Sequence, residues 1–254
     1  MKETRVIINA DDCGINQAVD AAIERFILLN KITSTTVMAN MDDLAGAKRL
    51  YDLYSDVISF GVHVNLTDGP SITKSQQLLD YGFLKEEGGI TLLNGYPFIH
   101  SRIPKRLHED IIKECVAQIN RVRDEGIEVS HIDSHHLMLT SLSMVSITPQ
   151  VLEKVGIKTM RRARNYMKSS SLSYFARQLW YGYMKLKTPG LRCVDWFDMF
   201  ESYYNLTNNG LVKEGTIELM THPGGSYPQE DELILSLDYS SFFTSAQLIN
   251  YNQL

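Results

Sequence analysis

Apolar segments that end abruptly in acidic or histidine side chains constrain the fold of this chain more than any other feature. Val6–Asp12 is a β-branched run that closes on two adjacent carboxylates, whereas Ile58–His63 and Val129–His136 close on histidines. Buried strands with charged groups at their carboxyl ends are typical of α/β folds, which place their chemistry there. We therefore expect three strand ends to supply the ligands of a small divalent-metal site, with one carboxylate left over. This is the outline of a metal-assisted hydrolase.

Strand and helix candidates alternate along the chain, with no repeat, low-complexity block or polar linker between them. The expected strands are rich in Ile and Val, which suits parallel strands buried on both faces; they are Arg5–Ala10, Thr33–Asn40, Ile58–Leu66, Glu128–Asp133, Ile157–Arg162, Leu191–Phe197 and Thr216–Thr221. The expected helices are Gln17–Leu29, Ala45–Asp52, Leu107–Glu125, Pro149–Val155, Leu172–Lys185 and a C-terminal one near Ser245–Asn250. About seven strand–helix units favour a TIM-like (β/α) barrel, distorted or incomplete, in a single domain of residues 1–254.

Two long segments fit this alternation badly, Pro70–Arg106 and Asn165–Gly190. Each follows an expected strand, and long connections in that position shape the substrate pocket of barrels. Gly88 and Gly89 lie near the centre of the first segment and predict a mobile tip that helps to cover the active site.

Composition excludes several classes of partner. With 44% hydrophobic and 22% charged residues and a net charge of −5, the 254-residue chain has the composition of a globular protein without a general basic field, so nucleic acid is not an expected partner. The three scattered cysteines show neither zinc-ribbon spacing nor a disulfide framework. No signal-peptide core or membrane-spanning apolar run is evident, so we expect a cytoplasmic protein with no membrane partner. A homo-oligomer remains open.

Taken singly, each candidate site residue has a structural interpretation. Asp12 can cap the helix that begins near Ile15, His63 can be a hydrogen-bonded residue at a strand end, and His222 can be a turn residue before Pro-Gly-Gly. Taken jointly they favour a site, because five of the seven histidines lie at three expected strand ends, and these ends meet on one face of a barrel: His63, His131, His135, His136 and His222. The residues alone do not assign separate roles to His131 and His136.

Five motifs in this order resemble the YdjC-type carbohydrate deacetylases, the family of chitooligosaccharide deacetylases that act on acetylated di- and oligosaccharides. They are Ile7–Gly14 (IINADDCG), Ile32–Asn40 (ITSTTVMAN), Gly61–Gly69 (GVHVNLTDG), His131–His136 (HIDSHH) and His222–Gly224 (HPG). The chain departs from the family pattern at Cys13, where phenylalanine is usual, and at Leu137–Leu139, where a further histidine is often found. Neither departure removes a metal ligand that the family uses, so they bear on the shape of the pocket.

The resemblance implies a (β/α) barrel with an Asp/His/His metal site that removes acetyl groups from N-acetylated sugars and releases acetate. Carried over to this sequence, Asp12, His63 and His135 would hold one divalent ion, Mg²⁺ or Zn²⁺. Asp11 would be the general base and His222 the general acid. Because neighbouring residues of a regular strand point apart, we expect the first strand to end between Asp11 and Asp12, with a bend at Gly14.

Further residues are candidates for supporting roles. Asp133 could orient a ligand histidine, and Arg162 and Arg164 could reach substrate hydroxyls or Asp11. Trp180 and Tyr181 could stack on a sugar ring, although core packing is the alternative for them. His100 and His108 lie outside the motifs and receive no role.

Two other functions stay open at this stage. Two histidines and one carboxylate also form the facial triad of non-haem iron oxygenases, although those proteins usually present a His-x-Asp/Glu pair on one strand of a β-sandwich. A non-catalytic sugar-binding barrel is the other alternative. It would need neither a base at Asp11 nor an acid at His222.

Overall fold

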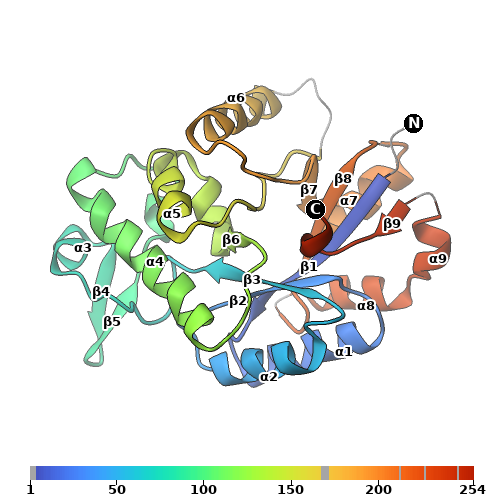
Figure 1. Cartoon of the computed structure of the whole chain (residues 1–254), viewed down its shortest axis with the longest axis horizontal. Coiled ribbons are helices and arrows are strands. Elements are labelled where there is room, and N and C mark those ends of the chain that lie inside the picture. Colours follow the sequence, from blue (N-terminus) through green and yellow to red (C-terminus); the bar gives the residue numbers. More distant parts are fainter. Residues whose placement is uncertain (1–3, 167–171, 212, 226, 245) are drawn as a thin grey trace.

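A curled parallel sheet organises the computed structural model, which describes residues 4–166, 172–211, 213–225, 227–244 and 246–254. Figure 1 shows the strands at the centre, with α1 (Gln17–Leu28) and α2 (Leu44–Tyr54) on one side and α4 (His108–Asp124) and α5 (Thr148–Val155) on another. The sheet has seven strands in the order β6-β3-β2-β1-β8-β7, with β9 beside β1. Their bounds are Thr4–Cys13 (β1), Ser34–Val37 (β2), Ser59–Val64 (β3), Ile132–Ser134 (β6), Trp196–Met199 (β7), Thr216–Thr221 (β8) and Ala246–Leu248 (β9).

Parallel pairing sets the register that brings the site residues together. Ala10 on β1 lies beside Thr35 on β2 and beside Thr221 on β8. His63 on β3 lies beside Asp133 on β6. Because paired residues of parallel strands point to the same face, the polar ends of β1, β3, β6 and β8 gather at one edge of the sheet.

Several of the helices pack their apolar sides against the sheet. The α-helices are Gln17–Leu28 (α1), Leu44–Tyr54 (α2), Gln76–Tyr81 (α3), His108–Asp124 (α4), Thr148–Val155 (α5), Leu172–Lys187 (α6), Phe200–Asn208 (α7), Pro228–Ser236 (α8) and Tyr239–Phe242 (α9). Short 3₁₀ turns occupy Tyr96–Phe98, Lys105–Leu107, His135–Thr140, Leu142–Met144 and Tyr251–Gln253. Asn16 begins α1, because its side chain accepts hydrogen bonds from the backbone N–H groups of Ala18 and Val19.

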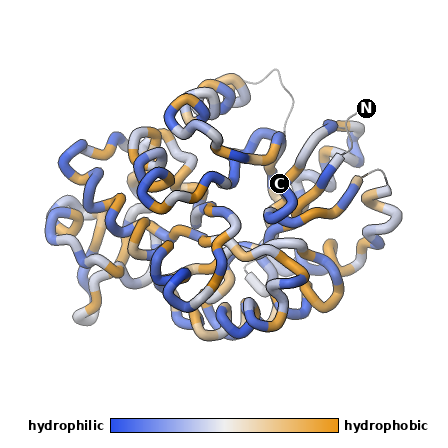
Figure 2. The backbone as a smooth tube through the Cα atoms, in the orientation of Figure 1, coloured by the Kyte–Doolittle hydropathy of each residue, from blue (hydrophilic) through white to orange (hydrophobic). Residues whose placement is uncertain are grey.

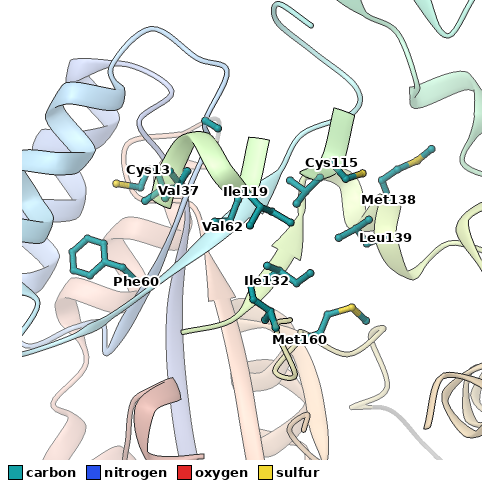
Figure 3. Close-up of a cluster of buried hydrophobic side chains, with 14 of the residues drawn as sticks. Cys13, Val37, Phe60, Val62, Cys115, Ile119, Ile132, Met138, Leu139 and Met160 are labelled. Carbon is teal, nitrogen blue, oxygen red and sulfur yellow. The ribbon is translucent and has the colours of Figure 1, made fainter. Parts of the chain in front are cut away.

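Two apolar clusters form the core. The larger one lies between the sheet and the helices, and Figure 3 shows part of it, where Val62 and Ile132 meet Ile119 of α4. Hydrophobic and hydrophilic stretches alternate along α1 and α2 in Figure 2, as expected for helices with one buried face. The smaller cluster lies inside the curl of the sheet and includes Ile7, Phe197 and Tyr251.

The prediction of a distorted (β/α) barrel is confirmed. The ladder is irregular between β6 and β7, where the expected strands Ile157–Arg162 and Leu191–Phe197 contribute isolated parallel bridges, Ile132 to Met160 and Thr159 to Arg192. The sheet is therefore a barrel with a poorly formed side. The parallel strands β2, β3 and β8 are buried along their whole length, although β2 is mostly Ser and Thr.

The C-terminal helix expected near Ser245–Asn250 is wrong. Residue 245 lies outside the described residues, and Ala246–Leu248 forms β9, which pairs with Thr4–Val6 of β1. β2 pairs with β1 only from Asn9 onward, so β9 pairs with this edge of β1 at Thr4–Val6, and Ile249 N–H donates to Val6 O at 2.9 Å. This tertiary pairing outweighs the weak local preference for helix.

The long segment Pro70–Arg106 has secondary structure of its own. It contains α3 and an antiparallel hairpin of β4 (Leu84–Glu87) and β5 (Ile90–Leu93), whose exposed turn is Gly88-Gly89. The second long segment contains α6, and residues 167–171 of it lie outside the described residues. Across the described part of the chain, the helices are all too short or too polar to span a bilayer.

Candidate metal centre and acid–base residues

A β-bulge at the end of β1 presents two adjacent carboxylates to the same site. The register between β1 and β2 shifts between Ala10 and Cys13, and Asp12 has a φ of 68°. The expected end of the strand between Asp11 and Asp12 is therefore not observed, because β1 continues to Cys13 and the bulge makes the bend. Gly14 follows with a φ of 83°. Bulges of this kind redirect side chains beside active sites, and aspartate tolerates the left-handed conformation better than most residues.

His63 lies between carboxylates from two strands. Its Nδ1 contacts Asp133 Oδ1 at 2.7 Å, and its Nε2 lies 3.3 Å from Asp12 Oδ1. The side chain is 2% exposed. Burial would lower the pKa of His63, but Asp133, Asp11 and Asp12 raise it to about 9. A positive charge is therefore strongly favoured at this point.

His135 follows β6, the strand next to β3, and its ring centroid lies 5.8 Å from that of His63. Its Nδ1 lies 2.7 Å from Thr67 Oγ1, which in turn donates to Asn65 Oδ1 at 3.2 Å. A hydroxyl that donates elsewhere can accept the Nδ1–H, and this leaves Nε2 of His135 with a free lone pair. Burial lowers the pKa of His135 to about 3, with His63 and His136 contributing in the same direction. The imidazole is neutral at neutral pH, as a metal ligand must be.

His222 stands at the end of β8 beside the two aspartates. Glu230 of α8 accepts hydrogen bonds from Thr221 Oγ1 at 3.1 Å and from the His222 backbone N–H at 3.2 Å. Its Oε2 lies 3.9 Å from His222 Nδ1. Burial would lower the pKa of His222, but Glu230, Asp11 and Asp12 raise it. The side chain can therefore carry a proton near neutral pH.

Arg161 is the central residue of the site that the sequence analysis did not identify. Its NH1 and NH2 groups each contact an Asp11 carboxylate oxygen at 2.6 Å, and NH1 also lies 2.8 Å from Asp133 Oδ2. Its Nε donates to Glu218 Oε1 at 2.7 Å. The side chain is 1% exposed. Burial would raise the pKa of Asp11, but Arg161 holds it well below its ordinary value.

Of the other residues considered in the sequence analysis, some line the site and some lie away from it. Arg164 pairs with Asp198 at 2.5 Å and lines the same cavity as Asp11 and His63. Arg162 instead donates to Asp195 O and lies over the Tyr181 ring. His131 is fully buried beneath the site against Tyr251, whereas His136 lines the cavity mouth with a φ of 51°.

One cavity of about 760 Å³ contains the predicted catalytic and metal-binding residues. Asp11, Asp12, His63, His135 and His222 all line it. A neighbouring cavity of about 470 Å³ shares His136, Leu137 and Arg164 with it and is bounded by Trp180 of α6 and by Tyr96, Ile99 and His100. The segment Pro70–Arg106 thus contributes to the surroundings of the site through Tyr96–His100 and not through its glycine turn.

The residues present fit a divalent cation. Among the described residues, two groups of three possible ligands have donor atoms within 4.8 Å of one another: Asp11, His63 and Asp133, and Asp68, His135 and His136. The first group is already occupied by the guanidinium of Arg161. Asp12 belongs to neither group, but its Oδ1 is buried without a hydrogen-bond partner and lies 3.3 Å from His63 Nε2. An orphaned carboxylate oxygen beside an imidazole nitrogen is a donor set that suits Zn²⁺ or Mg²⁺.

Comparisons with known proteins place this chain in a family. The model of the YdjC-like proteins matches residues 5–247. A carbohydrate deacetylase of Halalkalibacterium halodurans is 25% identical over 219 residues, which cover 86% of this chain and 84% of that protein. A carbohydrate deacetylase of Vibrio cholerae is 31% identical over 153 residues, which cover 60% of this chain and 57% of that protein.

Solved structures share the fold. A candidate cellobiose-phosphate cleavage protein of Enterococcus faecalis aligns with a TM-score of 0.75 and 21% identity, over 100% of this chain and 99% of that one. The Xyl-CE4 domain of a multidomain xylanase from a Trinervitermes trinervoides hindgut metagenome aligns with a TM-score of 0.50 and 7% identity, over 100% of this chain and 89% of that domain.

Proposed function

Because the chain belongs to the YdjC-like protein family, we propose that it is a metal-dependent carbohydrate deacetylase that hydrolyses the acetamido group of N-acetylated sugars and releases acetate. The observation that carries the proposal is the convergence of five side chains from four strand ends on one cavity: Asp11, Asp12, His63, His135 and His222. The curated relatives named as carbohydrate deacetylases, with 25–31% identity, support the substrate class.

In this proposal Asp12, His63 and His135 hold one divalent ion. The Nδ1 atoms of both histidines have partners, Asp133 and Thr67, so their Nε2 atoms remain for the ion. The bound ion would polarise the substrate carbonyl and lower the pKa of water. Mg²⁺ and Zn²⁺ both remain candidates. A mixed nitrogen and oxygen donor set favours Zn²⁺ on softness.

Asp11 serves as the general base. Its carboxylate stays ionised at neutral pH because the Arg161 guanidinium binds both of its oxygens. The same contacts fix the plane of the carboxylate, so that a remaining lone pair can point into the cavity. The attacking water transfers its proton to this oxygen, and this transfer typically contributes about 10²–10⁴-fold to the rate.

His222 serves as the general acid. Its raised pKa keeps a proton available, and Glu230 holds the backbone at the end of β8. Protonation of the departing nitrogen is needed because an amine is expelled as a neutral molecule much more readily than as an amide anion. Asp11 and His222 thus supply the base and the acid that hydrolysis of an amide requires.

The origin of the ligands argues against the oxygenase alternative. The proposed ligands come from the ends of β1, β3 and β6, whereas a facial triad usually takes His and Asp/Glu from one His-x-Asp/Glu strand. The His131-Ile-Asp133 sequence has that spacing, but His131 is buried under the site and stacks on Tyr251. It does not line the cavity.

The test measures metal content and acetate release on three variants, with N-acetylglucosamine and its short oligomers as substrates. Asp11→Asn should keep the metal and lose about 10²–10⁴-fold in activity. Asp12→Asn should lower metal occupancy, with partial recovery in excess metal. His222→Ala should keep the metal and slow amine expulsion. Full activity in both Asp11→Asn and His222→Ala would refute the mechanism, and metal loss only in Asp11→Asn would reverse the roles of the two aspartates.

A further inference from the structure

The C-terminal segment Ala246–Leu254 closes the end of the barrel opposite the metal centre. β9 pairs with Thr4–Val6, the first residues of β1. The backbone N–H of Tyr251 then donates to Ser59 Oγ, at the start of β3, at 3.0 Å. Asn250 and Gln253 cap the short 3₁₀ turn that follows. The segment therefore crosses beneath the sheet with a defined conformation.

Tyr251 reaches from this segment into the interior of the barrel and is 1% exposed. Its ring stacks on His131, with ring centroids 3.5 Å apart and an angle of 11° between the planes. Its hydroxyl donates a hydrogen bond to Glu218 Oε2, and Glu218 is fully buried on β8. The phenol thus supplies a neutral donor to a carboxylate that has no access to water.

Glu218 uses its other oxygen to hold Arg161. Oε1 accepts from Arg161 Nε at 2.7 Å, while the NH1 and NH2 groups of the same guanidinium bind Asp11. A guanidinium can offer a carboxylate either its NH1/NH2 end or its Nε/NH2 side. Occupation of Nε by Glu218 removes the second option.

We propose that Tyr251 and Glu218 are positioning residues that hold Arg161 with its NH1/NH2 end toward Asp11, which makes the C-terminal segment part of the catalytic centre. The inference rests on the proposed function of Asp11. Tyr251 acts on the reaction through Glu218 and Arg161. The connection Tyr251–Glu218–Arg161–Asp11 spans the barrel from its lower end to the base, and each contact in it is buried.

The first test compares kcat, KM, metal affinity and thermal stability of Tyr251→Phe and Glu218→Ala with the wild type. Tyr251→Phe should lower kcat about 10-fold, and Glu218→Ala about 100-fold, the same range as the loss on removing the hydrogen-bond partners that orient metal ligands. KM and metal affinity should change less than about 2-fold. Glu218→Gln keeps an acceptor for Nε and should restore most of the kcat lost in Glu218→Ala.

Tyr239→Phe is the matched control, because its hydroxyl makes a hydrogen bond to the Lys31 carbonyl oxygen at 3.1 Å, away from the site. It should lower stability without lowering kcat. Because Tyr251 acts through Glu218, the double variant Tyr251→Phe/Glu218→Ala should be no slower than Glu218→Ala alone. Multiplied effects, or an unchanged kcat in Tyr251→Phe, would overturn the proposal.

A second readout does not depend on activity. The Arg161 Nε–H should give a protected ¹H–¹⁵N resonance, assigned by its loss in Arg161→Lys. Tyr251→Phe should speed its exchange with solvent at least about 10-fold, and Tyr239→Phe should not. If the wild type releases no acetate but Tyr251→Phe still speeds exchange of the Arg161 Nε–H, the proposed function is refuted and the positioning of Arg161 stands. An unchanged exchange rate in Tyr251→Phe would refute the positioning itself.

Discussion

Asp20→Asn provides a quantitative test of how the turn at Gly14, directly after the bulge that contains Asp12, is held. Asp20 lies on α1, is 2% exposed and accepts a hydrogen bond from the Gly14 backbone N–H at 2.7 Å. Its second oxygen is buried without a hydrogen-bond partner, and the carboxylate of Asp43 lies nearby. Burial raises the pKa of Asp20 from 3.8 to about 6; the Gly14 N–H opposes this change and Asp43 adds to it.

The sign of the pH effect follows from this raised pKa. The folded protein binds the Asp20 proton more tightly than the unfolded chain, so this group lowers stability as the pH rises from about 4 to above 6. The difference between 3.8 and about 6 corresponds to a loss of about 3 kcal/mol at full ionisation. Asparagine keeps the acceptor for Gly14 and cannot ionise. The free energy of unfolding of Asp20→Asn relative to wild type should therefore increase by about 2 kcal/mol between pH 4.5 and pH 8.

Urea unfolding, followed by tryptophan fluorescence and circular dichroism at both pH values, measures this difference. Asp52→Asn is the control, because Asp52 is an exposed partner of Lys48 and should shift the free energy of unfolding by less than about 0.5 kcal/mol. Equal pH dependence in wild type and Asp20→Asn would show that the Asp20 carboxyl ionises normally in the folded protein. In that case the argument from burial would be wrong.

Three further predictions concern residues near the site and the ion that it would bind. Gly14→Ala places a Cβ 3.3 Å from Met38 O at a φ of 83°. The strain should lower the free energy of unfolding by about 1–2 kcal/mol and weaken metal binding, as measured by denaturant and metal titrations. Wild-type values in both titrations would show that no strain arises. Glu114→Ala removes the acceptor for Ile72 N–H, Thr73 N–H and Gln118 Nε2. It should lower the free energy of unfolding by about 2–4 kcal/mol and speed hydrogen exchange at residues 72 and 73. A loss of less than about 1 kcal/mol would contradict this prediction. Zn²⁺ or Mg²⁺ at 100 times its Kd should raise the unfolding free energy by about 2.7 kcal/mol in wild type and much less in His63→Ala; an equal rise in both would place the ion elsewhere.

The sequence predicts the strand ends well because each short apolar run that forms a buried strand is followed directly by the polar residues of the site. Val6–Ala10 and Ile58–Val62 are apolar enough to identify buried strands, and the polar residues after them mark the edge where the cavity lies. The C-terminal helix was mispredicted because its true partner, the edge of β1, lies more than 230 residues away in the chain. Local preference cannot report a contact of that range.

Arg161 escaped identification for a related reason. It lies in an irregular strand beside Arg162, and side-chain alternation places one of the two inside the barrel and the other outside without saying which. Arg162 and Arg164 were the candidates, yet Arg161 is the one that is buried. Thr159 and Met160, which lie on opposite faces just before it, are both buried, so the residues next to the two arginines do not indicate which of them points inward.

Charge balance connects the fold to the proposed chemistry. Asp11, Asp12 and Asp133 surround His63, and Arg161 is the guanidinium that pairs with two of them. Buried carboxylates in excess of buried cations are costly, and the raised pKa of His63, about 9, shows that protonation of this imidazole relieves the excess. A divalent ion at Asp12 would relieve it more completely and would return His63 to the neutral form that binds metal.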